Sequence, residues 1–324
     1  MPEDRALRGR AVLAFAAIYA LWGSTYLGIR YAVETIPPFL MAGTRHLTAG
    51  LILYAWTRPH GKARPKPREW ALAAAIGAMM LLGGNGLVSW AEQRVPSGLA
   101  ALIVASVPLW MTLLEALHRR SAPRAPVIAG LVLGLASLGW LLAPGRSDGA
   151  GRVDALGAGA LLLAALSWAI GSLSSRGVKF SVPIFHAVAM EMIAGGALLW
   201  GLGLATGEGA RLHLAAVSAR SILALGYLVV FGSLAGFSAY MWLLGVTTPA
   251  RVSTYAYVNP IVAVLIGWAV AGEALTLRIG LAALGIVGAV AVIIGFGGRR
   301  EKVEVARELV PEAEPARVAA GRSS

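Results

Sequence analysis

Long apolar runs separated by short polar connections dominate this sequence. With a window of about 19 residues, roughly the length of a helix that crosses a bilayer, ten such runs are found along the chain. They cover residues 11–32, 39–56, 70–90, 97–117, 125–143, 157–176, 184–205, 221–243, 251–271 and 278–296. Each run predicts a helix, because an open strand would leave backbone amides unpaired in lipid. The pattern therefore predicts an all-α membrane protein with ten transmembrane helices.

The composition supports a position within the lipid bilayer. Of the 324 residues, 57% are hydrophobic and 14% are charged, whereas soluble proteins carry about 25% charged residues. The mean hydropathy is +0.71. The chain contains no cysteine, which excludes disulfides, cysteine nucleophiles and cysteine metal ligands.

The net charge of +12 is distributed unevenly between the two sides of the predicted bundle. If the N-terminus is inside, 20 of the 28 Lys and Arg residues lie on the cytoplasmic side and seven lie on the other side, while Arg45 lies within a run. The positive-inside rule then places both termini in the cytoplasm. The basic residues do not form a folded face with interleaved aromatic side chains, so no nucleic-acid binding is expected.

The two halves of the chain resemble each other. At an offset of 146 residues, Trp22 aligns with Trp168. At an offset of 152 residues, Pro108 aligns with Pro260. Because each half holds five runs, the second half enters the membrane from the opposite side. This predicts two inverted five-helix repeats around a central cavity, which is an architecture of secondary transporters, although channels and enzymes also carry inverted repeats.

The domain boundaries follow from the runs. We expect a cytoplasmic N-terminal tail (1–10), a first repeat (11–143), a polar glycine-rich linker (144–156), a second repeat (157–296) and a cytoplasmic C-terminal tail (297–324). The first run follows three arginines and also fits a cleaved signal peptide. Cleavage would remove one helix of the repeat, so we expect that the first run is retained as a helix.

Short motifs occur in a characteristic order along both halves. They are Leu21-Trp22-Gly23-Ser24-Thr25-Tyr26, Gly84-Asn85-Gly86, Ala91-Glu92 and Pro96-Ser97-Gly98 in the first, and Ser167-Trp168-Ala169, Tyr255-Ala256-Tyr257-Val258-Asn259-Pro260 and Gly272-Glu273 in the second. With these motifs, residues 11–296 resemble the drug/metabolite transporter superfamily, and within it the EamA-domain permeases of the YedA-like exporter type. The resemblance implies a ten-helix exporter of small metabolites in the bacterial inner membrane. It does not specify the substrate, because the superfamily spans amino acids, purines, polyamines, drugs and sugar phosphates.

The first half departs from the second at one of these motifs. Gly272-Glu273 follows the fourth helix of the second repeat, whereas the equivalent stretch of the first repeat reads Arg119-Arg120-Ser121. Any role of Glu273 is therefore not duplicated in the first half.

Aromatic and hydroxyl side chains share faces of the first and sixth runs. Positions four apart lie on one face of a helix, so Trp22 lies above Tyr26 in the first run, and Trp168 lies above Ser172 in the sixth. Such faces can line a cavity that accepts an organic solute. The alternative is that both tryptophans pack in the core or anchor the helices at the headgroups.

The third, eighth and ninth runs provide further candidates for the cavity. Asn85 shares a face with Ser89, Tyr240 lies in the eighth run, and Tyr255 lies one turn before Asn259 in the ninth. An amide in hydrocarbon needs a partner, so Asn85 either lines the cavity or forms a hydrogen bond to another helix. We expect all five side chains to contact substrate.

Two prolines are expected to interrupt the fourth and ninth runs at matched depths. Pro108 and Pro260 each remove a backbone donor and clash with the carbonyl four residues earlier. The resulting kinks can act as gates in a transport cycle. The alternative is that they are static, as in many proline-kinked helices.

Ionisable residues within the runs are costly in lipid and mark functional sites or ion pairs. Arg45 and Glu191 occupy equivalent repeat positions that lie ~10 Å from opposite sides of the membrane, so no direct salt bridge is expected between them. Instead, Arg176 is expected to reach Glu191, and Glu34 or Glu92 to reach Arg45. The alternative to structural pairing is that Glu191 couples transport to protons or substrate.

No motif for catalysis is found in its required context. The sequence has no Walker motif, its five histidines lack metal-ligand spacing, and Gly145-Arg146-Ser147-Asp148-Gly149 matches a nucleophile elbow without the required strand-to-helix turn. Ser238 could act as the nucleophile of an intramembrane serine protease, but no histidine follows it in the sequence to activate it. We therefore expect a protein that is not an enzyme and that needs neither a cofactor nor a metal.

These observations favour a secondary active exporter of small organic metabolites, such as amino acids or drug-like compounds, that works by alternating access. Proton coupling is one option, and a monomer in the lipid bilayer is expected to be sufficient for transport. An uncoupled, channel-like facilitator and a membrane scaffold are the alternatives.

Overall fold

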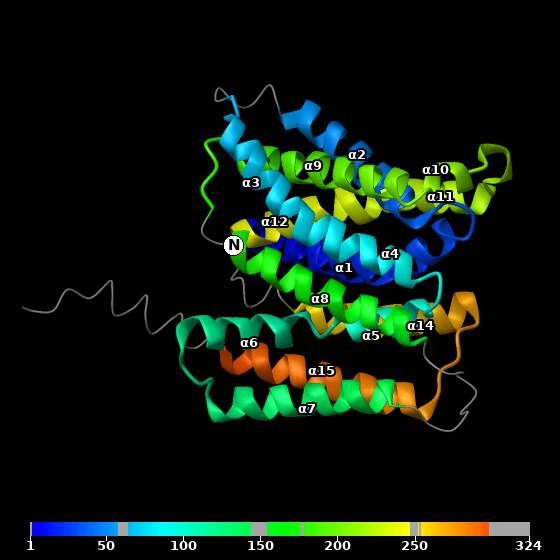
Figure 1. Cartoon of the computed structure of the whole chain (residues 1–324). Coiled ribbons are helices and arrows are strands. Elements are labelled where there is room, and N and C mark those ends of the chain that lie inside the picture. Colours follow the sequence, from blue (N-terminus) through cyan, green and yellow to red (C-terminus); the bar gives the residue numbers. More distant parts are fainter. Residues whose placement is uncertain are drawn as a thin grey trace, which may run out of the picture.

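The computed structural model of the chain describes residues 2–57, 64–143, 154–175, 178–246, 252 and 254–297. All regular elements within these ranges are helices, and none is a strand (Figure 1). Eight helical segments in this part of the chain are long and apolar enough to cross a membrane. The prediction of an all-α, multi-pass membrane protein is therefore confirmed.

The helices of the first half coincide with the first five apolar runs. They are α1 (Pro2–Ala32), α2 (Pro38–Thr57), α3 (Pro67–Gly77), η2 (Ala78–Gly86), α4 (Leu87–Ala91), α5 (Ser97–Val104), α6 (Val107–Arg119) and α7 (Ala125–Leu142). The third run is one continuous helical rod made of α3, η2 and α4. α1 begins nine residues before the predicted start, so most of the predicted N-terminal tail is helical.

The helices of the second half follow the same order. They are α8 (Ala155–Ser175), α9 (Ile184–Ala205), α10 (Glu208–Arg211), η3 (Leu214–Ala216), α11 (Ala219–Tyr227), η4 (Leu228–Ala235), α12 (Gly236–Val246), α14 (Tyr255–Ala271) and α15 (Leu277–Gly297). Most of the predicted linker and C-terminal tail, 144–153 and 298–324, lie outside the described residues.

Two of the ten predicted spans differ from a typical membrane helix. α14 has 17 residues, which is at the lower limit of the length that crosses the hydrocarbon core. α2 has 20 residues but carries Arg45 and His46 near its middle, and these two side chains lower its hydropathy. The count of ten spans therefore stays a prediction.

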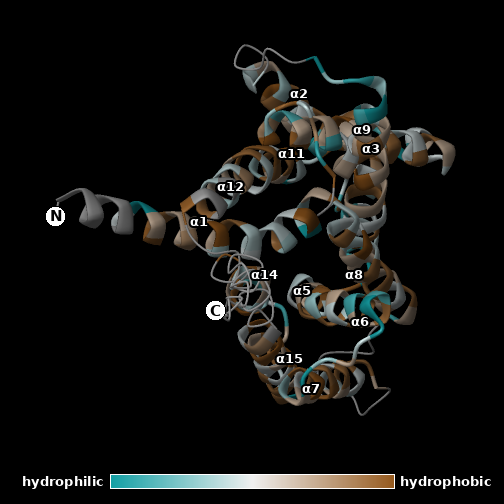
Figure 2. Cartoon of the chain, turned by 90° about the vertical axis from the view of Figure 1, so that its left-hand side faces the viewer, coloured by the Kyte–Doolittle hydropathy of each residue, from teal (hydrophilic) through white to brown (hydrophobic). Residues whose placement is uncertain are grey.

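Corresponding helices of the two halves pack against each other. α2 packs along α9, and α7 packs along α15; Figure 2 shows these two pairs at opposite ends of the molecule. Between them, α1 contacts α11, α12 and α14, whereas α8 contacts η2, α4 and α5. The first helix of each half therefore packs mainly against the third and fourth helices of the other half.

Small residues allow the close approach of the helix pairs. A Cβ atom at Gly77 of α3 would lie 2.7 Å from the carbonyl oxygen of Glu191 in α9, and one at Gly43 of α2 would lie 2.4 Å from Trp200 Cδ1 of α9. Glycines at such contacts let two backbones approach closely in a membrane.

Two buried glutamates join the halves at helix starts. The Glu208 carboxylate accepts a hydrogen bond from the Leu40 N–H at 2.9 Å, in the first turn of α2. The Glu69 carboxylate accepts hydrogen bonds from the backbone N–H and the hydroxyl of Ser181, ahead of α9. Helix starts carry unpaired N–H groups and a positive dipole end, so a carboxylate stabilises them. The two contacts lie towards opposite ends of the bundle (Figure 1).

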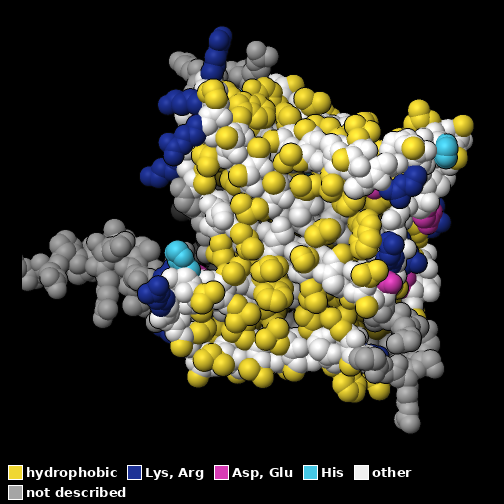
Figure 3. All heavy atoms as spheres, in the orientation of Figure 1, with side chains coloured by type: hydrophobic (Ala, Val, Ile, Leu, Met, Phe, Trp, Pro, Cys, Tyr) yellow, Lys and Arg dark blue, Asp and Glu magenta, His cyan; other side chains and the backbone are white. Residues whose placement is uncertain are grey.

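The outer surface is apolar along the middle of the bundle. Large hydrophobic side chains such as Leu223 and Leu284 are both 73% exposed. Figure 3 shows hydrophobic side chains spread over one whole face, with Lys and Arg gathered at its two ends. A surface of this kind is expected where lipid replaces water.

The third helical rod of each half contains one π-helix, η2 in the first half and η4 in the second. Periodicity did not predict either of them. η2 spans nine residues and η4 spans eight. The π-helix is rare and is often found at functional sites. η2 and η4 start 150 positions apart, which is close to the repeat offset of 152.

The two prolines take different positions in their helices. The backbone breaks at Ala105–Ser106, and Pro108 lies in the first turn of α6, where a missing N–H does no harm. Pro260 lies inside α14, which runs on without a break. The fourth span is thus broken just ahead of Pro108, whereas α14 continues through Pro260, and the action of either proline as a gate stays a prediction.

Candidate functional site

Aromatic side chains from both halves form a cluster where α1 meets α12 and α14. The ring of Trp22 lies 5.3 Å from Tyr240 and 5.0 Å from Tyr255, and the two tyrosine rings are 5.9 Å apart. All three side chains are half-buried. Three residues predicted to line the cavity are thus brought together; we call Trp22, Tyr240 and Tyr255 the aromatic cluster.

The backbone of η4 holds one member of this cluster in place. Trp22 donates its indole N–H to the Gly232 carbonyl oxygen at 3.1 Å. A Cβ atom at Gly236 would lie 2.5 Å from Trp22 Nε1, so the ring rests directly on the helix backbone. Tyr26, one turn after Trp22 on α1, is also half-buried and packs against the largest hydrophobic core cluster.

Arg45 reaches the same π-helix from α2. Its side chain is buried, and its Nε donates to the Ser233 hydroxyl at 3.0 Å. A Cβ atom at Gly232 would lie 3.0 Å from Arg45 Nη2. Arg45, which lies well inside a predicted run, is therefore next to the backbone group that binds Trp22. The contact of Ser233 with Arg45 was not predicted, because helical periodicity does not show which neighbouring helix a side chain faces.

Trp168 lies apart from the aromatic cluster, on the other half's π-helix. A Cβ atom at Gly84 of η2 would lie 2.8 Å from Trp168 Cε3. Its neighbour Ser167 donates a hydrogen bond to the Met79 carbonyl oxygen at 2.7 Å. Trp22 and Trp168 thus make equivalent contacts, each on the π-helix of the opposite half.

The remaining polar candidates on η2, α4 and α8 make local contacts. Ser89 is buried and donates its hydroxyl to the Asn85 carbonyl oxygen at 2.8 Å, within its own helix. The Ser172 carbonyl oxygen accepts a hydrogen bond from the Ser175 hydroxyl at 3.0 Å. The side chains of Asn85 and Ser172 are half-buried. Their contact with substrate stays a prediction.

Asn259 has an unsatisfied side-chain acceptor. It is buried one turn after Tyr255, and its Oδ1 has no hydrogen-bond partner among the described residues. A Cβ atom at Gly23 of α1 would lie 3.2 Å from the backbone carbonyl oxygen of Asn259. A buried acceptor without a donor is energetically unfavourable, so this amide is suited to receive a hydrogen bond from a ligand.

The predicted charge network forms only in part. Among the described ion pairs none joins Arg45 to Glu191, as expected, and Glu191 is half-buried on α9. Arg176, its expected partner, lies outside the described residues. Glu34 forms an ion pair with Arg220 at 3.6 Å, so the expectation that it reaches Arg45 is wrong, because it lies past the end of α1 at the surface.

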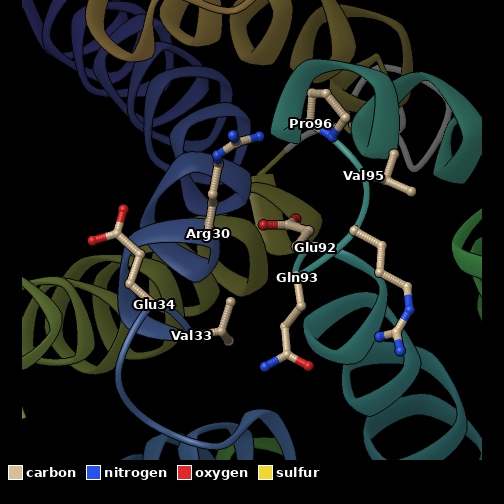
Figure 4. Close-up of a pocket in the computed structure, with 8 residues that line it drawn as sticks. Arg30, Val33, Glu34, Glu92, Gln93, Val95 and Pro96 are labelled. Atoms are coloured by element: carbon tan, nitrogen blue, oxygen red, sulfur yellow. The ribbon is translucent and has the colours of Figure 1, made fainter. Parts of the chain in front are cut away.

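A polar cavity of about 440 Å³ opens where the end of α1 faces the α4–α5 connection. It is lined by Arg30, Val33, Glu34, Glu92, Gln93, Arg94, Val95 and Pro96. Figure 4 shows Arg30 extending towards Pro96 and the Glu92 carboxylate pointing towards α1. We call this the outer pocket, because the charge count predicts that its end of the bundle is not cytoplasmic.

Glu92 connects the outer pocket to the interior. It is 3% exposed, and neither carboxylate oxygen has a hydrogen-bond partner among the described residues. The charges of Arg30, Arg45 and Glu273 act on it. The charge of Arg45 acts on Glu92 without a direct ion pair between the two side chains.

Glu273 is a polar centre that sequence reasoning did not place. Its carboxylate accepts hydrogen bonds from Arg30 Nη1 at 3.0 Å, from the N–H and hydroxyl of Ser97 at 2.8 Å each, and from the Gly98 N–H at 2.9 Å. The motif Gly272-Glu273 was visible in the sequence, but its partners lie 175 to 243 positions away. No periodicity links positions so distant.

The described residues contain no cluster of three or more potential metal-ligating His, Asp or Glu side chains. The site is built from aromatic rings, an arginine, amides and carboxylates. Such groups can bind an organic solute by packing and a few hydrogen bonds.

Comparisons with known proteins agree with this architecture. A sequence model described as the EamA-like transporter family matches residues 9–143 and 155–295. The chain is 39% identical over 287 residues to the uncharacterized inner membrane transporter YedA of Escherichia coli strain K12, covering 88% of this chain and 90% of that protein. It is 24% identical over 270 residues to the uncharacterized transporter YvbV of Bacillus subtilis strain 168, covering 83% and 87%. A crystal structure with 22% identity superposes with a TM-score of 0.60 over 90% of this chain and 99% of the other, which indicates a shared fold.

Proposed function

Because this chain belongs to the EamA-like transporter family, we propose that it is a secondary active exporter of small organic metabolites, such as amino acids or drug-like compounds, in the bacterial inner membrane. The observation that carries the proposal is the aromatic cluster, which both halves build together. A site made by two halves opens to one side or the other when the halves tilt, which is alternating access.

Two inverted repeats of five helices are part of this proposal. The family model matches the chain twice, over nearly the same lengths as the predicted repeats. The equivalent contacts of Trp22 on η4 and of Trp168 on η2 also support it. In this arrangement both termini lie in the cytoplasm, and a monomer contains the complete pathway.

The aromatic cluster is suited to a solute with an apolar body. Its three rings provide packing surface, the unpartnered Asn259 Oδ1 accepts a hydrogen bond, and the tyrosine hydroxyls supply further polar contacts. We propose that Tyr26, Asn85, Ser89, Trp168 and Ser172 line the rest of the pathway. Arg45, which binds η4 one residue after the group that holds Trp22, gives this part of the protein a positive charge.

Proton coupling is proposed to use the carboxylates of the pathway. Glu92 is buried without a hydrogen-bond donor, and Glu191 is half-buried in an apolar helix. Carboxylates that relay protons in transporters lie within membrane segments and face the pathway. Either residue can therefore exchange a proton when the site changes its access.

The test is flux into proteoliposomes of the purified full chain, with a panel of amino acids and drugs and with or without an imposed pH gradient. We expect saturable flux of one or more compounds that responds to the gradient. Flux that ignores the gradient would instead support an uncoupled facilitator, and no flux of any compound would support a scaffold.

A matched pair of variants tests the aromatic cluster. Tyr255→Ala removes two ring contacts and is expected to raise the KM of the transported solute roughly 2- to 10-fold, the range of an aromatic contact. Tyr54→Ala removes a tyrosine that packs against Trp70 and His186 elsewhere and is expected to leave the KM unchanged. Equal KM values for both variants would exclude the cluster as the binding site.

A further inference from the structure

We propose that Glu273 is a latch that closes the outer end of the protein, and that Arg30 changes partner from Glu273 to Glu92 when the latch opens. This inference rests on the proposed function, because a latch of this kind has a purpose only if the two halves move apart at that end. It assigns a role to Glu273 and Arg30, which the aromatic cluster does not use, and a further role to Glu92.

The latch is a dense set of charge-assisted hydrogen bonds. The Glu273 side chain is 8% exposed and accepts from the Arg30 guanidinium and from Ser97 and Gly98, the first two residues of α5. Bonds from N–H and O–H groups to an ionised carboxylate are about twice as strong as neutral ones. The start of α5 adds its positive dipole end.

The fit around the carboxylate is tight. A Cβ atom at Gly267 of α14 would lie 2.5 Å from Glu273 Oε2, and one at Gly98 would lie 3.3 Å from the same oxygen. Two glycines thus leave just enough room for the carboxylate. The backbone at Gly267 and Gly98 therefore fits closely around the Glu273 carboxylate.

The latch joins the two halves at the outer end. Arg30 and Ser97 belong to the first half, whereas Glu273 belongs to the second. Arg30 lies eight residues after Trp22 on α1, or ~12 Å along the helix axis. A passage from the aromatic cluster to the outer side therefore requires separation of the groups that Glu273 holds.

The first half has no carboxylate at the position that corresponds to Glu273. The stretch of the first half that corresponds to Gly272-Glu273 reads Arg119-Arg120-Ser121, and basic side chains cannot accept hydrogen bonds from helix N–H groups. This particular contact is therefore not duplicated at the inner end. The latch favours the state in which the outer end is shut.

Glu92 is the second partner for Arg30. Its carboxylate points towards α1 in Figure 4, is buried without a donor, and lies within range of the Arg30 charge. Removal of Arg30 from Glu273 exposes a guanidinium that needs a counter-charge, and Glu92 is the buried carboxylate next to it. The exchange of one carboxylate for the other lowers the energy of the open state.

The absence of native cysteines allows a direct test by pulsed electron spin resonance. Spin labels at Gln93→Cys and Leu275→Cys report the width of the outer end, and labels at Ala122→Cys and Val246→Cys report the inner end. All four side chains are exposed, and each site of one pair lies 153 positions from a site of the other. Both double variants are measured on the full chain in lipid nanodiscs without any solute.

We expect that Glu273→Gln increases the ratio of wide to narrow outer distances about tenfold, since hydrogen bonds to a charged group are lost, and narrows the inner distances at the same time. Arg30→Gln, which leaves the contact with α5 intact, is expected to give a smaller shift in the same directions and serves if Glu273→Gln does not fold. Glu92→Gln removes the competing carboxylate and is expected to shift the outer pair towards narrow distances.

Glu115→Gln is the matched control, because it removes an exposed carboxylate that pairs with Arg119 on α6; both distances should stay as in the native chain. Unchanged outer distances in Glu273→Gln and Arg30→Gln would overturn the latch. Wider outer distances without narrower inner distances would also overturn the latch, because a purely local disruption of the outer end would produce that result. Since no solute is present, these results are independent of whether the liposome assay finds a substrate.

Discussion

Trp22 and Arg45, which come from two different helices, bind consecutive residues of η4. Trp22 donates to the Gly232 carbonyl oxygen, and Arg45 donates to the Ser233 hydroxyl. An aromatic ring that can pack on a solute and a buried positive charge are therefore positioned by the same turn of one π-helix. A movement of η4 would displace both side chains together.

The Arg45–Ser233 hydrogen bond is expected to contribute to stability. Ser233→Ala removes a buried acceptor of a charged donor and should lower the free energy of unfolding by about 1–3 kcal/mol. Thr206→Ala, at the exposed end of α9, removes a hydroxyl that bonds only to its own helix and should change the free energy by less than about 0.5 kcal/mol. Unfolding of both variants in detergent with urea measures the difference, and equal values would contradict the prediction.

The contact between Trp168 and η2 leaves no room for a side chain at Gly84. Gly84→Ala would place a Cβ atom 2.8 Å from the ring and is expected to destabilise the protein by about 1–3 kcal/mol, as overpacking does. At Gly201 of α9 nothing lies within 4 Å, so Gly201→Ala should be neutral or stabilising by up to about 1 kcal/mol. Thermal unfolding compares them. A stable Gly84→Ala variant would show that Trp168 moves freely.

Much of the fold is predictable from apolar runs, since lipid forces each of them into a helix. The sequence repeat also identified Trp22 and Trp168 as equivalent residues, and they make equivalent contacts. Periodicity places a side chain on a face of its own helix, but it does not say which helix that face meets. The partners of Ser233 and Glu273 were therefore not predicted, and of the two carboxylates expected to reach Arg45, Glu34 pairs with Arg220 instead.

Local geometry was the other part that the sequence did not reveal. η2 and η4 consist mainly of apolar residues and glycines, and the same residue types form α-helices elsewhere in the chain. A π-helix differs from an α-helix in its i→i+5 hydrogen bonds, and apolar residues and glycines give no sequence signal for that difference. The position of Pro108 at a helix start, rather than in a helix interior, likewise depends on the break at Ala105–Ser106.

Two buried glutamates near the ends of one helical rod are expected to respond oppositely to the same substitution. Glu69 receives hydrogen bonds from Ser181 and from the Lys66 N–H, so Glu69→Gln should lower the free energy of unfolding by about 1.5–3 kcal/mol. Glu92 receives none among the described residues, and an amide is less costly to bury than an ionised carboxylate. Glu92→Gln should therefore be neutral or stabilising.

Urea unfolding at neutral pH measures both variants. The charged and titratable groups near Glu92 are Tyr26 and Arg30 of α1, Arg45 of α2, and Glu273; none of them forms an ion pair with it. If Glu92→Gln were as destabilised as Glu69→Gln, Glu92 would have to be ionised and held by its neighbours, and its proposed exchange of Arg30 would lose its basis.

The two prolines are expected to differ in their effect on transport. Pro260 lies inside α14, one residue after Asn259 and five after Tyr255 of the aromatic cluster. Pro260→Ala restores a backbone donor and straightens the helix, so it should lower the kcat of solute flux in proteoliposomes and raise the free energy of unfolding. Pro108 lies in the first turn of α6, where proline fits without a kink. Pro108→Ala should leave the kcat within about twofold of the native value. Unchanged flux kinetics in Pro260→Ala would show that Pro260 does not act as a gate.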